Sequence, residues 1–226
     1  DVYGGTWQLL GEQLPQLGIR SEALLAGELD RVAAALQRGA GLLYFESPSN
    51  PTLDILDIRK LVALAHEHGA LVAIDNTFAS PVNQQPHDLG VDIVIHSATK
   101  YLGGHSDITA GVVSGRQELI APIAAWRKNL GQIISPETAH LLSRSLCTLE
   151  IRVKRQNENA AAVAAAMAKH PRVKRVLYPG LPGFPGHALA ARQMSGFGGM
   201  LSIEVAGSGA DAARVVDRLR IFSLAP

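Results

Sequence analysis

Four short apolar runs in the first half of the chain constrain its fold more than any other feature. Three are apolar almost throughout, at residues 41–46 (GLLYFE), 70–75 (ALVAID) and 91–97 (VDIVIHS), and a fourth follows at 110–115 (AGVVSG). Strands without polar alternation are buried on both faces, which is typical of a parallel sheet covered by helices. The sequence therefore predicts a mostly parallel sheet at the centre of an α/β fold.

Two amphipathic helices are predicted beside the first runs. Residues 28–39 place Leu29, Val32 and Leu36 on one helical face, and residues 57–69 repeat such a pattern between the first two strands. A helix between consecutive strands is the connection that a parallel pair requires. We expect these helices to cover the sheet.

The chain changes character after Pro136. Residues 137–170 contain neither glycine nor proline and predict one long helix or two. Strands are then expected at residues 173–179, 198–205 and 220–225, with a helix at 209–219 between the last two. We infer a large domain at residues 1–145 and the start of a smaller α+β domain at residues 146–226.

Composition excludes several classes of partner. The formal net charge is +1, and no stripe of basic residues is interleaved with aromatic ones, so we expect no nucleic-acid partner. No apolar run is long enough to span a bilayer, so we expect no membrane partner. The single cysteine, Cys147, rules out an internal disulfide and fits a reducing compartment, the cytoplasm. A small-molecule partner is the remaining expectation.

Polar side chains stand where three of the apolar runs end. Glu46 ends the first run, Asp75 ends the second, and Ser97, Thr99 and Lys100 follow the third. In open α/β sheets, ligands bind beyond the carboxyl ends of the strands. If these strands are neighbours, the two carboxylates, two hydroxyls and one amine face a single crevice.

This set of groups fits one cofactor. A desolvated lysine becomes a nucleophilic amine, and hydroxyls beside backbone N–H groups bind phosphate. A carboxylate stabilises a protonated ring nitrogen. Amine, phosphate cradle and ring-nitrogen partner together describe a site for pyridoxal 5'-phosphate (PLP). Taken singly, Lys100 is equally a surface lysine, Asp75 a turn former or helix cap, and Ser97 and Thr99 local turn residues.

Four motifs resemble the Cys/Met-metabolism family of PLP enzymes, which includes cystathionine γ-synthases, γ-lyases and β-lyases. They are DVYGGT, ESPSNPT, AIDNTFASP and HSATKYLGGHSDITAG, beginning at residues 1, 46, 73 and 96. The resemblance implies an aspartate aminotransferase-like fold, fold type I, with PLP in the large domain. It also implies a homotetramer built as a dimer of dimers. Family members are longer at both ends, so further segments are expected on either side.

The resemblance assigns the cofactor-binding residues. Lys100 is expected to bond to the cofactor aldehyde as a Schiff base and, once a substrate has displaced it, to move protons. Ser97 and Thr99 are expected to bind the phosphate. Asp75 is expected to pair with the ring nitrogen.

Three more residues are expected around the cofactor ring and the substrate. Tyr3 is expected to stack on the ring and to assist proton transfer at the leaving group. Asn50 is expected to hydrogen-bond the phenolic oxygen of the ring. Both Glu46 and Asn50 are expected to line the substrate pocket. No metal site is expected, since His66 and His68 point to different faces of their helix.

The expected reaction is elimination or replacement at the γ-carbon of a sulfur amino acid or homoserine ester in trans-sulfuration, of the cystathionine γ-synthase or γ-lyase type. Gly5 lies where methionine γ-lyases typically carry cysteine, and VYGGT differs from the form typical of β-lyases. Methionine γ-lyase and O-acylhomoserine sulfhydrylase activities remain alternatives. A catalytically inactive or truncated homologue is the non-enzymatic alternative, and an unrelated nucleotide-binding α/β protein is the third.

Overall fold

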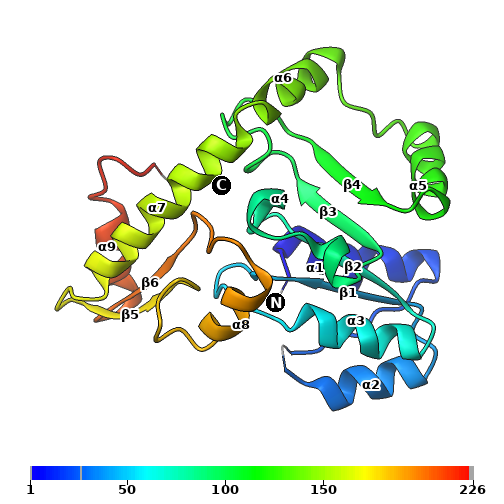
Figure 1. The fold of residues 1–226 in the computed structure, drawn as a ribbon, viewed down its shortest axis with the longest axis horizontal. Coiled ribbons are helices and arrows are strands. Elements are labelled where there is room, and N and C mark those ends of the chain that lie inside the picture. Colours follow the sequence, from blue (N-terminus) through cyan, green and yellow to red (C-terminus); the bar gives the residue numbers. More distant parts are fainter. Residues whose placement is uncertain (1, 26, 224–226) are drawn as a thin grey trace.

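A four-stranded sheet is the centre of the computed structural model, which describes residues 2–25 and 27–223. Its strands lie in the order of the sequence: β1 (Leu42–Glu46), β2 (Leu71–Asp75), β3 (Ile93–Ser97) and β4 (Gly111–Gly115). The first three are parallel to one another, and β4 runs antiparallel to β3. This confirms the predicted α/β fold and its mostly parallel sheet (Figure 1).

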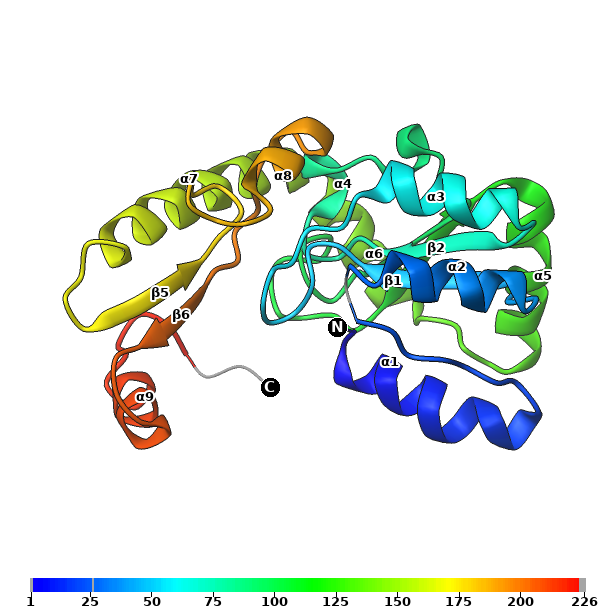
Figure 2. The ribbon, with the colours of Figure 1, turned by 90° about the horizontal axis from the view of Figure 1, so that it is seen from below.

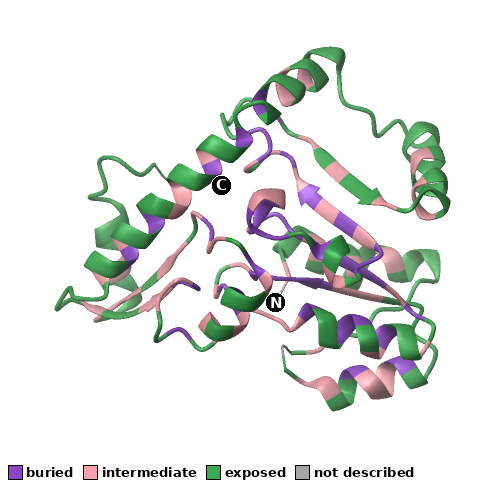
Figure 3. Cartoon of the chain, viewed as in Figure 1, coloured by how far each residue is buried: buried purple, intermediate pink, exposed green. Residues whose placement is uncertain are grey.

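The main core lies between the sheet and two helices, α2 (Leu29–Gln37) and α3 (Ile58–Glu67). Asp57 caps α3 by accepting a hydrogen bond from the backbone N–H of Lys60 (3.2 Å). Buried side chains of both helices share this core with buried side chains of β1, β2 and β3 (Figure 3). The two helices expected from the sequence are thus present.

A helical segment that the sequence did not predict begins the chain. It comprises α1 (Gly4–Gln8), the π-helical turn η1 (Leu9–Gln13) and the 3-10 turn η2 (Leu14–Leu17). Gly18 ends it with a left-handed backbone (φ 77°). Within residues 4–17 no side chain is buried, and Figure 2 shows the segment apart from α2 and α3.

Short elements and one exposed helix connect the strands. The turns α4 (Ser80–Asn83) and η3 (Pro86–Leu89) separate β2 from β3, and α5 (Gln117–Asn129) follows β4. None of the residues of α5 is buried, and its surface includes Trp126, which is 66% exposed (Figure 3).

The long helical stretch after Pro136 is two helices. They are α6 (Pro136–Leu146) and α7 (Leu149–Met167), which meet at Cys147 and Thr148. Figure 1 shows α7 leading from the sheet to a second, smaller group of elements. Among the described residues, no helix is both long enough and apolar enough to cross a bilayer.

The smaller group is an antiparallel ribbon with two short helices. Its elements are β5 (Val173–Leu177), α8 (His187–Gln193), β6 (Ser202–Val205) and α9 (Gly209–Val216). Tyr178 is fully buried against Ala160 and Ala164 of α7, which ties the ribbon to that helix.

One prediction here was wrong. No strand forms over residues 220–223, and the remainder of the predicted run, 224–225, lies outside the described residues. Ile221 is 93% exposed, and residues 220–223 pair with neither strand of the β5–β6 ribbon.

Candidate active site at the carboxyl ends of the parallel strands

The sheet brings the predicted strand-end residues together. Glu46 and Asp75 are direct partners in the register of β1 and β2. Asp75 is in turn the partner of Ile95 on β3, two residues before Ser97. The carboxyl ends of three neighbouring parallel strands therefore carry the two acids and the first hydroxyl, as the sequence predicted.

Thr77, which the sequence analysis did not select, links the ends of β2 and β3. Its backbone N–H donates to Oδ1 of Asp75 (2.9 Å), and its Oγ1 accepts from the backbone N–H of Ser97 (2.7 Å). The short Asp75–Thr77 contact is an Asx-type turn, which fixes the carboxylate relative to its own backbone. Thr77 thus holds Asp75 through its backbone N–H and Ser97 through its hydroxyl.

A tight turn follows β3 and carries Lys100. Backbone N–H groups of Gly103 and Gly104 donate to the carbonyls of Ala98 and Lys100, each at 2.7 Å. A Cβ at residue 103 would lie 2.8 Å from the Ala98 oxygen, so the turn closes only with glycine there. The compact turn holds the backbone of Lys100 beside the end of β3.

Several polar atoms at these strand ends have no hydrogen-bond partner among the residues that the structure describes. Across residues 2–25 and 27–223, no hydrogen bond reaches Nζ of Lys100, Oγ of Ser97 or Oδ2 of Asp75. Lys100 is exposed, and the other two residues are half-buried. Thr99 differs, because its Oγ1 accepts from the backbone N–H of Ala110 (3.2 Å). An amine, a hydroxyl and a carboxylate oxygen are therefore available to a ligand.

Glu46 is buried, with only 6% of its surface exposed. Burial raises the pKa of its carboxyl group, a hydrogen bond from the backbone N–H of Tyr3 (2.6 Å) opposes the rise, and the negative charge of Asp75 adds to it. The Tyr3 contact joins the beginning of the chain to the end of β1. The tyrosine ring itself is 61% exposed.

Two further residues feel the charge of Asp75. Burial and the Asp75 carboxylate both raise the pKa of Tyr44. Burial lowers the pKa of His96, and the same carboxylate opposes that change. Sequence reasoning missed both residues, although Tyr44 lies two positions before Glu46 and therefore on the same face of β1. That alternation was the signal that could have found it.

Asn50 lies in the turn that follows β1. Two X-Pro peptides in this turn are cis, Ser47–Pro48 and Asn50–Pro51. Oγ of Ser49 accepts a hydrogen bond from the backbone N–H of Asp54 (3.1 Å), which closes the turn. Asn50 itself is half-buried.

Two buried amides support the ends of β1 and β2 from behind. Gln84 donates through Nε2 to the backbone oxygen of Ser47 (2.8 Å) and to Oδ1 of Asn76 (2.7 Å). Asn76 donates through Nδ2 to the backbone oxygen of Gln84 (3.0 Å). Since Ser47 follows Glu46 and Asn76 follows Asp75, this network fixes the two strand ends that carry the acids.

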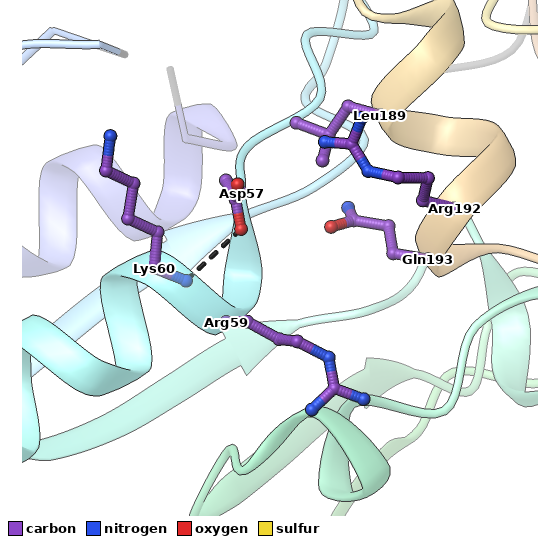
Figure 4. Close-up of a pocket in the computed structure, with 6 residues that line it drawn as sticks. All are labelled: Asp57, Arg59, Lys60, Leu189, Arg192 and Gln193. Atoms are coloured by element: carbon purple, nitrogen blue, oxygen red, sulfur yellow. Dashed lines mark hydrogen bonds between the residues drawn. The ribbon is translucent and has the colours of Figure 1, made fainter.

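Two cavities lie away from these residues. One, of about 570 Å³, opens between the start of α3 and α8, and Figure 4 shows Arg192 and Gln193 across it from Asp57 and Arg59. The other, of about 500 Å³, includes Asp92 and Arg116 in its lining. None of the predicted site residues lines either cavity.

Comparison with known proteins gives matches over the whole chain. The model of the family described as Cys/Met metabolism PLP-dependent enzyme matches residues 1–226. A cystathionine gamma-synthase of Mycobacterium leprae is 44% identical over 226 residues, which are 100% of this chain and 58% of that protein. A cystathionine beta-lyase of Lactococcus lactis subsp. cremoris is 43% identical over 226 residues, with 100% and 59% covered.

Solved structures also match the whole chain. The chain is similar to a cystathionine gamma-lyase from Lactobacillus plantarum complexed with L-serine, with a TM-score of 0.95 and 40% identity. It is also similar to a cystathionine gamma synthase from Xanthomonas oryzae pv. oryzae in complex with cystathionine, with a TM-score of 0.94 and 43% identity. In both cases the match covers 100% of this chain and 59% of the other. The chain thus spans less than two thirds of the length of these relatives.

Proposed function

Since this chain belongs to the Cys/Met metabolism family of PLP-dependent enzymes, we propose that it holds PLP at the carboxyl ends of β1, β2 and β3 and acts at the γ-carbon of an amino-acid substrate. The observation that carries the proposal is the set of unpartnered polar atoms there: Nζ of Lys100, Oγ of Ser97 and Oδ2 of Asp75, within the described residues. An aldehyde, a phosphate and a protonated ring nitrogen need an amine, a donor and a carboxylate respectively, so this donor set fits PLP.

PLP, when bound, acts as an electron sink for the substrate's α-carbon. Asp75 would hold the proton on the ring nitrogen, because its negative charge stabilises the protonated form. Thr77 keeps that carboxylate oriented through its hydrogen bond to Oδ1. Ser97 would donate to the phosphate, with Thr99 beside it on the same turn. Lys100 would hold the cofactor through its amine and then carry protons to and from the substrate.

Tyr3, Asn50 and Glu46 complete the site in this proposal. Tyr3 would stack on the ring and assist the leaving group, which is supported by its backbone contact with Glu46 at the end of β1. Asn50 would donate to the phenolic oxygen of the ring. Glu46 and Asn50 would line the substrate pocket.

The choice among the γ-acting types rests on the start of the chain. A Cβ at Gly5 would lie 3.0 Å from Cε1 of Tyr3, so any larger residue there would move the tyrosine ring. We therefore favour the γ-synthase or γ-lyase type over methionine γ-lyase. The relatives include proteins named gamma-synthase, gamma-lyase and beta-lyase, so similarity alone does not choose between them.

The proposal extends to a homotetramer in the cytoplasm. Apolar side chains of α5 and the loop after it are exposed, among them Trp126 (66%), Leu130 (60%) and Ile133 (67%). Such a surface favours burial against another chain. Light scattering of the purified protein tests the assembly, and a mass of one chain would contradict it.

Covalent trapping tests the cofactor proposal. Purified protein should be yellow, and borohydride should bleach it and attach the cofactor to the peptide that contains Lys100. Lys100→Ala should lower turnover by about 10³-fold or more, because both attachment and proton transfer depend on the amine. Lys60→Ala, a second exposed lysine, is the matched control and should keep full activity. Protein that stays colourless after reconstitution with PLP would contradict the proposal.

A product assay then tests the substrate. Cystathionine, O-succinylhomoserine, O-acetylhomoserine and methionine are offered side by side, with and without a thiol. Release of a 2-oxo acid and ammonia indicates elimination, and a new thioether indicates replacement. Cleavage of cystathionine only at its β-carbon, seen as homocysteine with pyruvate, would contradict action at the γ-carbon.

A further inference from the structure

Arg152 of α7 donates hydrogen bonds to the turn that follows Lys100. Its Nη1 donates to the backbone oxygen of Tyr101 (2.8 Å), and its Nη2 donates to the backbone oxygens of Ser145 (2.9 Å) and Leu102 (3.4 Å). Its Nε donates to Oγ1 of Thr148 (3.1 Å). A planar guanidinium with five fixed N–H donors suits such a set of acceptors, which a single ammonium group could not reach together.

Among the described residues, this guanidinium is paired with no acid. In the part of the chain that the structure describes, no carboxylate lies within ion-pair distance of Arg152, and all four of its acceptors are neutral oxygens. Hydrogen bonds from a charged donor are stronger than those between neutral groups. The contact with Ser145 also places the cation at the C-terminal end of α6, where the helix dipole favours it. Arg152 therefore fastens two backbone segments to α7.

The turn is shaped to receive this side chain. A Cβ at Gly104 would collide with Nη1 of Arg152, and the same residue has a left-handed backbone (φ 73°). Only glycine satisfies both conditions at low cost. The backbone N–H of Gly104 in turn donates to the backbone oxygen of Lys100 (2.7 Å). The turn is therefore bonded to Lys100 within itself and to Arg152 from outside.

Tyr101 is held at its other end as well. Its Oη accepts a hydrogen bond from the backbone N–H of Gly199 (2.9 Å), 98 residues away in the sequence. The residue next to Lys100 is thus fixed by α7 through its carbonyl and by the segment before β6 through its ring.

We propose that Arg152 is a positioning residue: through the carbonyls of Tyr101 and Leu102 it holds the turn that aims the amine of Lys100. This inference rests on the proposed function for its catalytic consequence. Its structural content, the order of the turn at residues 98–104, can be measured without cofactor. Arg152 touches neither substrate nor cofactor in this proposal and acts only through Lys100.

Three variants test the proposal. Arg152→Gln removes the charge and the fork, Arg152→Lys keeps the charge but cannot span the carbonyls, and Arg155→Gln is the control on the exposed side of the same helix, where Arg155 pairs with Glu158. Hydrogen–deuterium exchange is measured on each purified protein without and with PLP. Absorbance of the PLP-loaded protein is titrated with pH, and kcat and KM are measured separately.

Arg152→Gln and Arg152→Lys should both speed exchange at the amides of Gly103 and Gly104 by about tenfold or more, while β2 stays protected. The pH midpoint of the cofactor absorbance should shift, and kcat should fall by about 10²-fold with KM nearly unchanged, as expected for a displaced catalytic amine. Arg155→Gln should resemble the natural protein in every measurement.

Two results would overturn the proposal. In one, exchange rises only in the last turn of α6, which would mean that Arg152 orders the backbone at Ser145 and not the turn at residues 98–104. In the other, exchange in the turn rises but the absorbance midpoint and kcat stay as in the natural protein. Failure of the natural protein to bind PLP would instead overturn the proposed function, and the exchange data without cofactor would still decide whether Arg152 orders the turn.

Discussion

Glu46 and Asp92 are both buried acids of the central sheet, with 6% and 4% of their surface exposed, yet their surroundings are opposite. Asp92 stands just before β3, at the amino end of that strand. It accepts from the backbone N–H of Val72 (2.9 Å), from Nη1 of Arg116 (3.2 Å) and shares a hydrogen bond with Nε2 of His66 (2.8 Å). Glu46 stands at the carboxyl end of β1 with the Tyr3 amide as its hydrogen-bond donor and a second acid beside it.

The pKa shifts follow these surroundings. Burial alone would raise the pKa of Asp92, but the hydrogen bonds with His66 and Val72 and the nearby Arg116 charge outweigh it and lower that pKa. Burial raises the pKa of Glu46, and the Asp75 charge adds to the rise. A buried acid that is fully partnered stabilises the fold, whereas one left with a like charge and spare oxygen lone pairs is suited to a ligand. We therefore expect the amino end of the sheet to serve stability, and we propose the carboxyl end as the place of the chemistry.

Among variants of the acids compared here, the largest effect should come from Asp75→Asn. Loss of the charge beside the ring nitrogen should lower kcat by about 10²-fold or more, because a neutral amide no longer stabilises the ring proton. The melting temperature should change little, since the amide keeps an oxygen for the Thr77 N–H. Asp88→Asn, an exposed acid of η3, is the control. Full activity in Asp75→Asn would contradict the proposal that the carboxyl end of the sheet holds the cofactor.

Asp92→Ala should show the reverse pattern. It removes the acceptor of the buried Val72 N–H and the partner of His66 and Arg116, which should cost about 2–3 kcal/mol of the free energy of unfolding. Activity per folded molecule should stay within about twofold of the natural protein, because the site lies at the other end of the strands. Denaturant unfolding measures the change, with Glu67→Ala on the exposed end of α3 as control. A variant as stable as the natural protein would show that Asp92 is not structural.

The smallest effect, and the sharpest contrast, is in pH dependence. The lowered pKa of Asp92 gives stability that is present above its unfolded value, about 3.9, and is lost as pH falls towards the folded pKa. The raised pKa of Glu46 does the opposite: its favourable contribution is present below about pH 4.3 and is lost as pH rises through the folded pKa.

The free energy of unfolding of Glu46→Gln should therefore rise relative to that of the natural protein as pH rises from about 4 to 7. The free energy of unfolding of Asp92→Asn should instead rise relative to that of the natural protein as pH falls through the acid range. Melting temperatures across this range measure both trends. Parallel curves for the two variants would contradict the opposite assignments.

The strand ends were predictable because apolar runs closed by polar residues are visible in one dimension. Thr77 was not, since it resembles an ordinary turn residue until its contacts with Asp75 and Ser97 are known. Tyr44 was missed although the alternation of side chains along β1 places it on the face of Glu46. Arg152 acts on a carbonyl 51 positions away, which no local pattern reveals.

The N-terminal helix was missed, and the C-terminal strand was wrongly predicted, for another reason. Residues 4–17 include Gly4, Gly5, Gly11 and Pro15, which have poor helix propensity, and the segment has no buried face to produce a periodic pattern. The run at 220–225 has the apolar content of a strand, but a strand needs a partner edge, which sequence does not supply. The boundary predicted near residue 146 stays a prediction, beside the break between α6 and α7.

The amides of Asn76 and Gln84 have a practical consequence. Their side chains are 0% and 1% exposed, and each donates to an oxygen of the other or of the strand ends. Solvent deuterium can replace these carboxamide hydrogens only when the buried hydrogen bonds that they make have opened. With an isotope label on the two side-chain nitrogens, the rate of this exchange would measure how often the structure opens beside the proposed site. The measurement alters no group that a ligand would touch.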